Sequence, residues 1–577
     1  MDDFNGNFNA DDVINEFKSQ FKWPSKDDYA AVVKPNKIGI KLLISAIITL
    51  VAGGIAYYIM LPAINIHAQE LYTFLIFLVA VFMISFFVCC GALRRPEYKE
   101  YVKSKSKAPL IIIAVIVALT LIGSLTGAKI LRARSYNRLM TVEKADFNDD
   151  FKEINFNEVP RLDKTSTKTL ADNKLNELSQ YVSQFLVADQ TTQINYKGRP
   201  IRVAPLVYGD FFKWLNNTKN GLPAYMIIDV VTQEVTVVEL ENGMRYSPSE
   251  LFNEKLERHL RFQYPTEIMG ESSFEIDDQG HPYWITPSLT KKIGLFGGTD
   301  VKGAIITDAA NGESKYYEIS KVPNWVDKVY SDNLLLEQYN YYGRFQKGFV
   351  NSILGQKDVK VSSSGNGYIA LNDDVWLYTG ITSASSDASN VGFVLCNQRT
   401  KETRYYQIGG ATELGAMESA EGAVQNYGYT AAFPILLNVA DEPTYFMSLK
   451  DSSNMVKQYA MVNLKQRTLF GIGASPEKCA ESYIESLKSN NVITDDDISN
   501  KDNVIKNVTV TGAIEDIRST VKDGNTYYYF KVENQYYSIS AGKWEDAVVM
   551  NIGDIITIEH KPLEKAQAII PAKSIKQ

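Results

Sequence analysis

Residues 225–240 read YMIIDVVTQEVTVVEL, and this stretch decides the fold of most of the chain. An apolar, β-prone run reaches Asp229, a short polar segment follows, and β-branched residues then resume. Asp and Asn favour tight turns because their side-chain oxygen accepts hydrogen bonds from backbone amides two residues further on. The stretch therefore predicts a strand, a turn that begins at Asp229, and a second strand.

Three further stretches follow the same pattern. They are 304–319 (AIITDAANGESKYYEI), 393–408 (FVLCNQRTKETRYYQI) and 459–473 (YAMVNLKQRTLFGIG). Their turns begin at Asp308, Asn397 and Asn463, at the position equivalent to Asp229. With a strand before each hairpin and a helix after it, the repeating unit is a three-stranded meander plus a helix. The alternative is four unrelated hairpins in an α+β domain.

The helices of these units are predicted from their start signals. Ser followed by Pro is a good N-terminal signal, and it precedes helices expected at 250–262 and 477–489. Residues 325–330 and 413–424 fill the same place in the two middle units. We expect the four units to superpose and to pack through sheet edges or faces, because a lone three-stranded unit buries too little apolar surface. Any binding site should then lie between units.

Toward the N-terminus, residues 42–66, 71–93 and 108–128 contain no charged residue. A helix needs about 20 apolar residues to cross a bilayer, so these stretches predict three transmembrane helices within a membrane anchor at 38–128. No Asp, Glu, Lys, Arg or His lies inside them. Transport by this chain alone is disfavoured, because ion and proton paths need such groups.

The orientation of the anchor follows from Lys and Arg in the flanking segments. The tail at 1–37 carries Lys22, Lys26, Lys34 and Lys37 near the first span, and the connection at 94–107 is basic, whereas the connection between the first two spans has no Lys or Arg. Basic loops stay in the cytoplasm, so we expect the tail in the cytoplasm and residues 129–490 outside the cell membrane. The basic residues just after the third span oppose this orientation but are fewer.

Gly123 and Gly127 lie four residues apart in the third span. Small residues at this spacing let helix backbones approach closely. They indicate packing of the three membrane helices against one another. The alternative is a seam between copies of the chain in a homo-oligomer.

The C-terminal part reads as a separate module. Residues 491–507 form a polar linker, and residues 508–577 hold short strand-like runs separated by tight turns. This pattern predicts a small closed β-barrel of the OB or SH3 kind. Its clustered tyrosines fill the barrel or stack on a base or sugar. The chain has a net charge of −7, so the electrostatic attraction that single-stranded nucleic acid needs is missing, and we expect no nucleic-acid partner.

Residues with catalytic or metal-binding chemistry are few. The four His are scattered, and of the four Cys only Cys396 and Cys479 lie outside the anchor. We expect no catalytic site, no metal site, no cofactor and no disulfide framework. The compact acidic candidates are 277–278 and 373–374. Adjacent carboxylates in a strand point to opposite faces, so neither pair suits acid–base catalysis.

Several blocks carry a resemblance to known proteins. They are YGDFFKWL (208–215), LRFQYPT (260–266), PYWIT (282–286), IGLFGGTDVKG (293–303) and ALNDDVWLYTGITS (370–383). The blocks resemble a family of uncharacterised multi-pass membrane proteins from Gram-positive bacteria. The hairpin-plus-helix units resemble PepSY-type modules, which are small exported domains. The resemblance implies a domain in the cell envelope and brings no catalytic residues.

The sequence therefore predicts an α+β protein with three N-terminal transmembrane helices, tandem meander-plus-helix repeats at 129–490 and a small C-terminal barrel. Repetition without catalytic residues favours a non-catalytic envelope protein, because repeated modules build extended binding surfaces. Its partner would be an envelope protein, a peptide or a wall polymer. The alternatives are an accessory subunit of a membrane transport or secretion complex and a cell-wall or peptide hydrolase.

Overall fold

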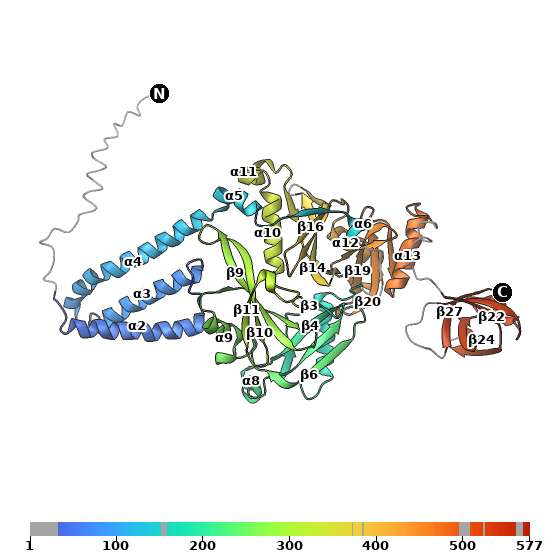
Figure 1. The fold of residues 1–577 in the computed structure, drawn as a ribbon, viewed down its shortest axis with the longest axis horizontal. Helices are drawn as coiled ribbons and strands as arrows, with labels where there is room; N and C mark the ends of the chain where they lie inside the picture. The colour runs from blue at the N-terminus through green and yellow to red at the C-terminus, as the bar shows by residue number, and fades with distance from the viewer. Residues whose placement is uncertain are drawn as a thin grey trace, which may run out of the picture.

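The computed structural model describes residues 33–151, 159–371, 373–383, 386–494, 508–522, 525–560 and 569–576. The described chain mixes helix and sheet. Three long helices lead into a domain that contains four sheets, and a further sheet lies at the C-terminus (Figure 1). The α+β class is therefore confirmed.

The three long helices are α2 (Ile38–Met60), α3 (Gln69–Cys89) and α4 (Lys99–Thr126). All three are long and apolar enough to cross a membrane, as the sequence predicts. The first ends earlier than predicted. Leu61 adopts a left-handed backbone with φ of 50°, and Pro62 then prevents the helix from continuing.

Four sheets follow, and they share one strand order. In each, a long strand pairs along one edge with two short strands and along its other edge with a second long strand, which pairs with a last strand. The first sheet contains β2 (Phe185–Val187), β3 (Thr192–Tyr196), β4 (Arg199–Tyr208), β5 (Leu222–Asp229) and β6 (Val235–Met244). The second contains β7 (Ile268–Met269), β8 (Ser273–Ile276), β9 (Pro282–Ile293), β10 (Gly297–Asp308) and β11 (Ser314–Glu318).

The third sheet contains β12 (Lys360–Ser362), β13 (Gly367–Leu371), β14 (Asp374–Ser383), β15 (Ser386–Asn397) and β16 (Thr403–Tyr406). The fourth contains β17 (Thr430–Ala431), β18 (Ile435–Val439), β19 (Glu442–Lys450), β20 (Val456–Asn463) and β21 (Phe470–Gly473). We call the four sheets, each with the helix before it, repeats one to four. The three-stranded meander of the sequence analysis is the second half of each repeat.

Helices α7 (Lys164–Asn176), α9 (Leu256–Gln263), α10 (Asp332–Arg344) and α12 (Glu413–Ala423) precede the four sheets, and α13 (Pro476–Ser489) follows the last. The domain also contains helices α5 (Lys129–Asn137), α6 (Phe147–Asp150), α8 (Phe211–Asn217) and α11 (Gly348–Val350). Ser475 caps α13 by accepting a hydrogen bond from the amide of Lys478. The helices expected at 413–424 and 477–489 therefore form.

One expected helix is wrong, and another begins later than expected. Residues 325–330 are not helical, because the backbone amides of Asp327 and Lys328 bind the buried Glu275 instead of forming a first turn. The helix expected at 250–262 begins only at Leu256. Glu250 is turned inward, where it accepts hydrogen bonds from Tyr208 and Trp214.

Neighbouring repeats pack face to face. In β9, Trp284 belongs to the core shared with repeat one, while Ile285 belongs to the core shared with repeat three. In β14, Leu377 faces repeat two and Trp376 faces repeat four. Successive side chains of a strand point to opposite faces, so the interior sheets are buried on both sides.

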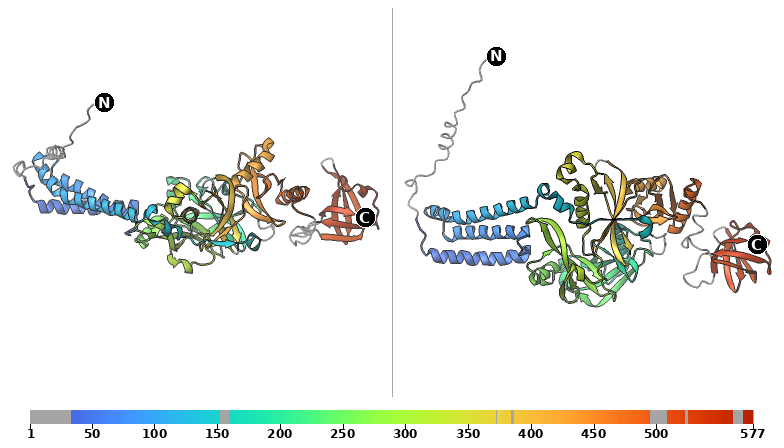
Figure 2. Two further views of the ribbon diagram at one scale, coloured as in Figure 1. Left: turned by 90° about the horizontal axis from the view of Figure 1, so that it is seen from above. Right: turned by 45° about the horizontal axis from the view of Figure 1, so that its top comes forward.

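One strand that precedes repeat one in the chain joins the sheet of repeat three. After α5, β1 (Glu143–Ala145) pairs in parallel with β16 of repeat three, and the two further views in Figure 2 show this segment crossing the domain. The first described segment after the anchor therefore contributes to the third sheet before repeat one begins.

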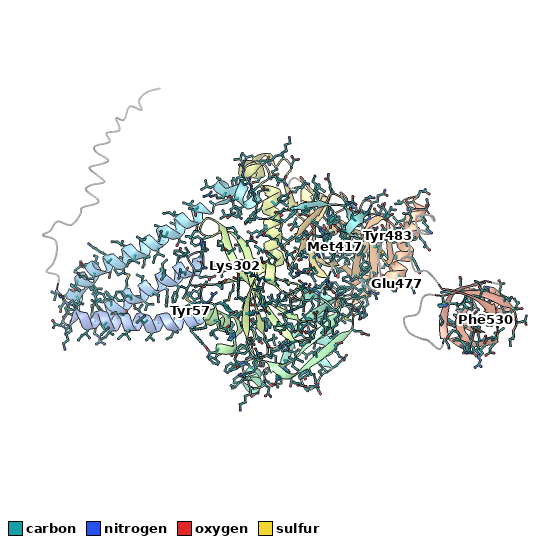
Figure 3. All side chains as sticks on the ribbon, in the orientation of Figure 1. Tyr57, Lys302, Met417, Glu477, Tyr483 and Phe530 are labelled. Atoms are coloured by element: carbon teal, nitrogen blue, oxygen red, sulfur yellow. The ribbon has the colours of Figure 1, made fainter. Side chains whose placement is uncertain are left out.

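The anchor and repeat two are in direct contact. The Nε of Arg261 donates to the carbonyl of Leu61 over 3.0 Å, and the amide of Ile64 donates to the carbonyl of Pro265. The ring of Tyr57, labelled near the end of α2 in Figure 3, lies edge-on to Phe262 with 5.6 Å between centroids. Repeat two is therefore fixed to the ends of the membrane helices.

The C-terminal sheet has the order β22-β26-β27-β25-β24-β23. Its strands are β22 (Val508–Ala513), β23 (Asp516–Lys522), β24 (Asn525–Val532), β25 (Gln535–Ser540), β26 (Ile555–His560) and β27 (Ile569–Lys576). It curves around a core that includes Phe530 (Figure 3). The predicted closed barrel is wrong: among the described strands, β22 and β23 are the two edges of the sheet and do not pair with each other.

Candidate functional site

The four turn residues occupy equivalent places. The side-chain oxygen of Asp229 accepts hydrogen bonds from the amides two and three residues further on. Asp308, Asn397 and Asn463 do the same in their own repeats. Each residue belongs to a different sheet. They therefore organise four separate hairpins and do not form one site.

Gly123 and Gly127 lie against the tip of the β9–β10 hairpin. A Cβ at Gly123 would stand 2.6 Å from the Leu295 side chain, and one at Gly127 would stand 3.1 Å from the Gly297 amide nitrogen. Sequence reasoning assigned both glycines to helix–helix packing. In the structure their small size instead lets α4 approach repeat two.

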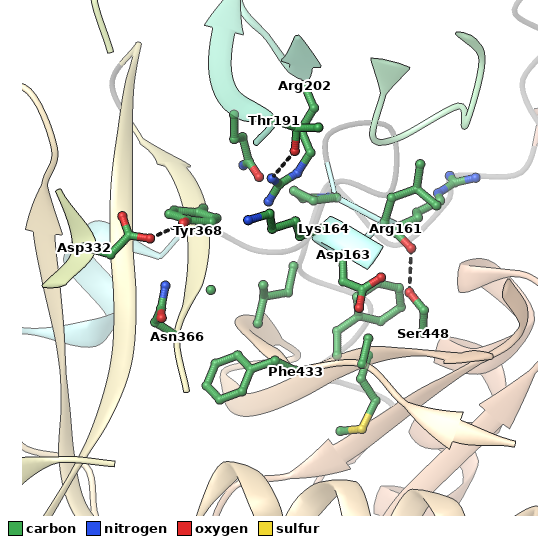
Figure 4. A pocket seen from close by; sticks show the side chains of 18 of the residues that line it. Arg161, Asp163, Lys164, Thr191, Arg202, Asp332, Asn366, Tyr368, Phe433 and Ser448 are labelled. Atoms are coloured by element: carbon green, nitrogen blue, oxygen red, sulfur yellow. Dashed lines mark hydrogen bonds between the residues drawn. The ribbon is translucent and has the colours of Figure 1, made fainter. Parts of the chain in front are cut away.

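The candidate site is a cavity of about 370 Å³ where repeats one, three and four meet (Figure 4). Its wall combines β3 and β4, the segment before α7, β13 and β19. It is lined by charged, polar and apolar side chains, among them Arg161, Asp163, Lys164, Thr191, Gln193, Arg202, Lys328, Asp332, Tyr368, Phe433, Ile435, Phe446, Met447 and Ser448. Ligand pockets typically begin near this volume.

Arg202 is the central charged group of this cavity. Its side chain is 4% exposed, and among the described residues its Nε has no hydrogen-bond partner. Its Nη1 donates to the Thr191 hydroxyl over 3.2 Å, and its guanidinium carbon lies 5.4 Å from the centroid of the Tyr368 ring. Burial lowers the pKa of Arg202, which Tyr368, Asp163 and Asp332 oppose.

Two more nitrogen donors lie beside Arg202. Gln193 is 6% exposed, and its Nε2 has no partner among the described residues. The exposed Lys164 extends into the space between Arg202 and Tyr368 in Figure 4. Buried donors without partners are costly, since each loses its hydrogen bonds to water. A ligand with acceptor oxygens would satisfy them.

The acidic groups of the cavity are already engaged. Asp163 lies 2.6 Å from the Lys450 ammonium and caps α7 through the Ser166 amide. Burial alone would raise the pKa of Asp163, but Lys450 and Ser166 hold it below the usual value. Asp332 accepts hydrogen bonds from Tyr368 and Gln398. In the described part of the chain no carboxylate forms an ion pair with Arg202 or Lys164, so the cavity favours an anionic ligand.

The wall opposite Arg202 is apolar. It is formed by Phe433, Ile435, Phe446 and Met447, and Figure 4 shows Phe433 facing the cavity across from Arg202. An apolar wall of this kind is suited to contact an apolar side chain or an acyl group of a ligand. The arrangement suits a ligand in which a carboxylate or phosphate is joined to an apolar body.

The acidic pairs suggested by the sequence are used structurally. Asp374 receives two hydrogen bonds from Arg399 and one from Asn397, while Asp373 lies on the preceding turn with φ of 67°. Asp277 accepts backbone amides within its own turn. Neither pair presents two free carboxylates to a common space.

The two cysteines outside the anchor are buried. Burial raises the pKa of Cys396 to about 12 and also raises the pKa of Cys479, which keeps both as unreactive thiols. Within the described ranges no group of three or more His, Cys, Asp or Glu residues is arranged to hold a metal ion.

Sequence reasoning missed Arg202, although one signal was present. Arg202 stands inside RPIRVAPLVY (199–208), a mostly apolar run that forms β4. A charged residue on the buried face of such a strand has a function or a partner. Comparison of the sequence with protein-family models and with curated proteins finds no match to either.

Proposed function

We propose that this chain is a membrane-anchored, non-catalytic binding or scaffold protein of the cell envelope. Its repeats act outside the cell membrane, with the N-terminal tail in the cytoplasm, as the basic residues of the tail and of the 94–107 connection favour. The cavity at Arg202 is its binding site. The partner is an envelope protein, a peptide or a wall polymer that inserts an anionic group into this cavity.

One observation carries the proposal. Arg202 is buried in a cavity between three repeats, and its Nε has no partner among the described residues. A folded domain rarely keeps such a cation without a role, because burying an unpaired charge is expensive. The repeats surround it with further nitrogen donors and an apolar wall. The equivalent strand order of the four sheets supports the likeness to tandem PepSY-type modules.

In this proposal the C-terminal sheet is an accessory domain of the binding protein. Its order, with β25 and β27 parallel, supports an OB-like arrangement in which the first strand is bent into β22 and β23. It carries no assigned ligand in this proposal.

Photocrosslinking in living cells tests the proposal. With p-benzoylphenylalanine at Phe433, on the cavity wall, we expect a discrete crosslinked envelope partner, and none with the same group at Leu414, which is 57% exposed on α12. Arg202→Met should reduce the adduct at least tenfold, which corresponds to about 1.4 kcal/mol of binding. Arg202→Lys keeps the charge and should retain part of it.

The outcomes separate the alternatives. An adduct that does not depend on Arg202, or equal adducts at Phe433 and Leu414, would contradict the assignment of the cavity. Recovery of a transporter or secretion subunit at Phe433 would favour the accessory-subunit reading over an independent scaffold. Migration of the full chain with a larger complex on a blue-native gel would support that reading.

A further inference from the structure

Exposed apolar side chains concentrate at the end of the domain that adjoins the membrane helices. Between Lys129 and residue 494, fourteen large hydrophobic side chains of the described chain are exposed, and ten of them lie on α5, α8, α9, α11 or the short turns beside these helices. Exposed apolar groups that cluster in this way mark an interaction surface. Their position decides which partner they contact.

The first lobe of this surface consists of Phe211, Phe212, Leu215, Phe252 and Phe262. Their exposed fractions range from 52% to 72%. Phe211 packs on Trp214 with 5.6 Å between ring centroids, and Trp214 packs on Phe252 over 5.7 Å. The aromatic rings thus form one continuous cluster across α8 and the turn before α9.

This lobe is held rigidly next to the first membrane helix. The indole of Trp214 donates to the buried Glu250 over 2.7 Å, which fixes α8 against the sheet. The Tyr58 hydroxyl of α2 donates to Asn253, and Arg258 of α9 donates to the Tyr58 carbonyl over 3.1 Å. The aromatic cluster therefore begins beside the C-terminal end of α2.

The second lobe lies across the bundle and consists of Ile130, Leu131, Val350, Ile353 and Leu354. Leu354 is 82% exposed and Leu131 is 67% exposed. Helix α5, which carries Ile130 and Leu131, follows α4 directly, and Figure 1 shows α5 and α11 on the opposite side of the bundle end from α8 and α9. The Lys129 ammonium lies 4.7 Å from the centroid of the Tyr341 ring and joins α5 to α10.

We infer that both lobes insert into the headgroup and acyl boundary of the bilayer that the three helices span. The surface is continuous with the membrane helices, and aromatic rings favour this boundary. Lys129, Arg132 and Arg134 flank the second lobe, where they can meet lipid phosphates. With α2 to α4 between two inserted lobes, the domain lies directly on the membrane surface in a fixed orientation.

Photocrosslinking to lipid tests this surface. The full chain, with p-benzoylphenylalanine placed singly at Phe212, Phe262 or Leu354, is reconstituted in nanodiscs of phosphatidylcholine and phosphatidylglycerol. Mass spectrometry after illumination should detect phospholipid adducts at all three positions. The control positions Leu414 and Tyr427 are 57% and 65% exposed on other parts of the domain, and their adduct yield should be at least tenfold lower.

Other outcomes overturn the inference. Crosslinked dimers without lipid adducts would assign the lobes to a second copy of the chain. In native membranes, adducts to another protein in place of lipid would assign them to a partner within the membrane. Equal lipid yields at test and control positions would also contradict a domain that lies on the membrane surface. None of these results depends on the cavity at Arg202.

Discussion

Asn397 and Asp374 form a buried polar pair in repeat three. The Nδ2 of Asn397 donates to the Asp374 carboxylate over 2.8 Å, while its Oδ1 accepts from the amides of Arg399 and Thr400. One side chain thus closes its own turn and also binds the first residue of the neighbouring strand β14.

The other repeats contain an equivalent pair, with an acidic turn residue in repeats one and two and an amide in repeat four. Asp229 pairs with Arg199 over 2.9 Å, and Asp308 lies 2.9 Å from the Nε2 of His281. In repeat four, Asn463 donates to Glu442. An acidic turn residue therefore meets Arg or His at the start of the long strand or just before it, whereas an amide meets an acid.

The pairing predicts the effect of a single exchange. Asn397→Asp should place two carboxylates in contact where both positions are less than a tenth exposed, and we expect a loss of at least about 2 kcal/mol of stability. The thermal unfolding midpoint, followed by tryptophan fluorescence, measures it. Adding Asp374→Asn restores one acid and one amide, so the double variant should be more stable than the single one.

A matched exchange in repeat two provides the control. Asp308→Asn keeps the acceptor for both turn amides, and its partner His281 is not an acid. It should cost less than Asn397→Asp. Equal losses in the two repeats would show that the turn alone, and not the pair, determines stability.

Stability should fall as pH rises, because of Glu275. Burial raises the pKa of Glu275 from 4.5 to about 7, and burial together with Glu275 raises the pKa of Asp327. The folded state therefore keeps protons that the unfolded state releases. The stabilisation is complete below about pH 4.5, the pKa of Glu in the unfolded chain, and is lost as pH rises through about 7.

Unfolding midpoints between pH 4.5 and 8 test this dependence. Glu275→Gln removes the titrating group, so its midpoint should change less with pH than that of the original protein, even if it is lower at pH 5. Parallel curves for the two proteins would rule out Glu275 as the source.

Replacing Arg202 should separate stability from binding. Arg202→Met keeps much of the length of the side chain and removes a buried charge with an unpartnered nitrogen. We therefore expect the free energy of unfolding to rise by about 1–2 kcal/mol. A raised unfolding midpoint together with a lost crosslink at Phe433 is the expected result. A large drop in the midpoint would mean that Arg202 is chiefly a structural residue.

Gly294 should be intolerant of a side chain. It has φ of +62°, and a Cβ there would lie 2.6 Å from the backbone nitrogen of Gly127, the residue that follows α4. Gly294→Ala therefore combines backbone strain with a clash and should cost more than about 1 kcal/mol. Gly91→Ala is the control, because Gly91 has φ of +74° with nothing within 4 Å. Equal unfolding midpoints would exclude the contact as the cause.

The sequence predicts what local pattern encodes. Long apolar runs define the membrane helices. The turns at Asp229 and its counterparts are predictable because each side chain binds a backbone amide only two residues further along the chain. The short strands β2 and β3 were missed because they obtain their stability from pairing with β4 and carry little pattern of their own. The helix expected at 325–330 failed for the same reason, since the buried Glu275 takes the amides needed for its first turn.

The cavity could not be predicted because its residues meet only through tertiary packing. Arg202, Tyr368 and Phe433 belong to three repeats, and no spacing in the sequence relates them. A charged residue in the apolar strand β4 was the one available signal, but the sequence did not show which groups would surround it.

The pairing of β1 with β16 sets an order of events during synthesis. Glu143 lies opposite Arg404, so the segment that follows the anchor has no strand partner until the third repeat has left the ribosome. At about 5–20 residues per second, that delay is on the order of 10–50 s. The face of the second sheet that packs on the third sheet stays uncovered meanwhile. A chain that stops before residue 403 would therefore keep its membrane helices but could not form the β1–β16 pair. We expect quality-control proteases to degrade such a chain.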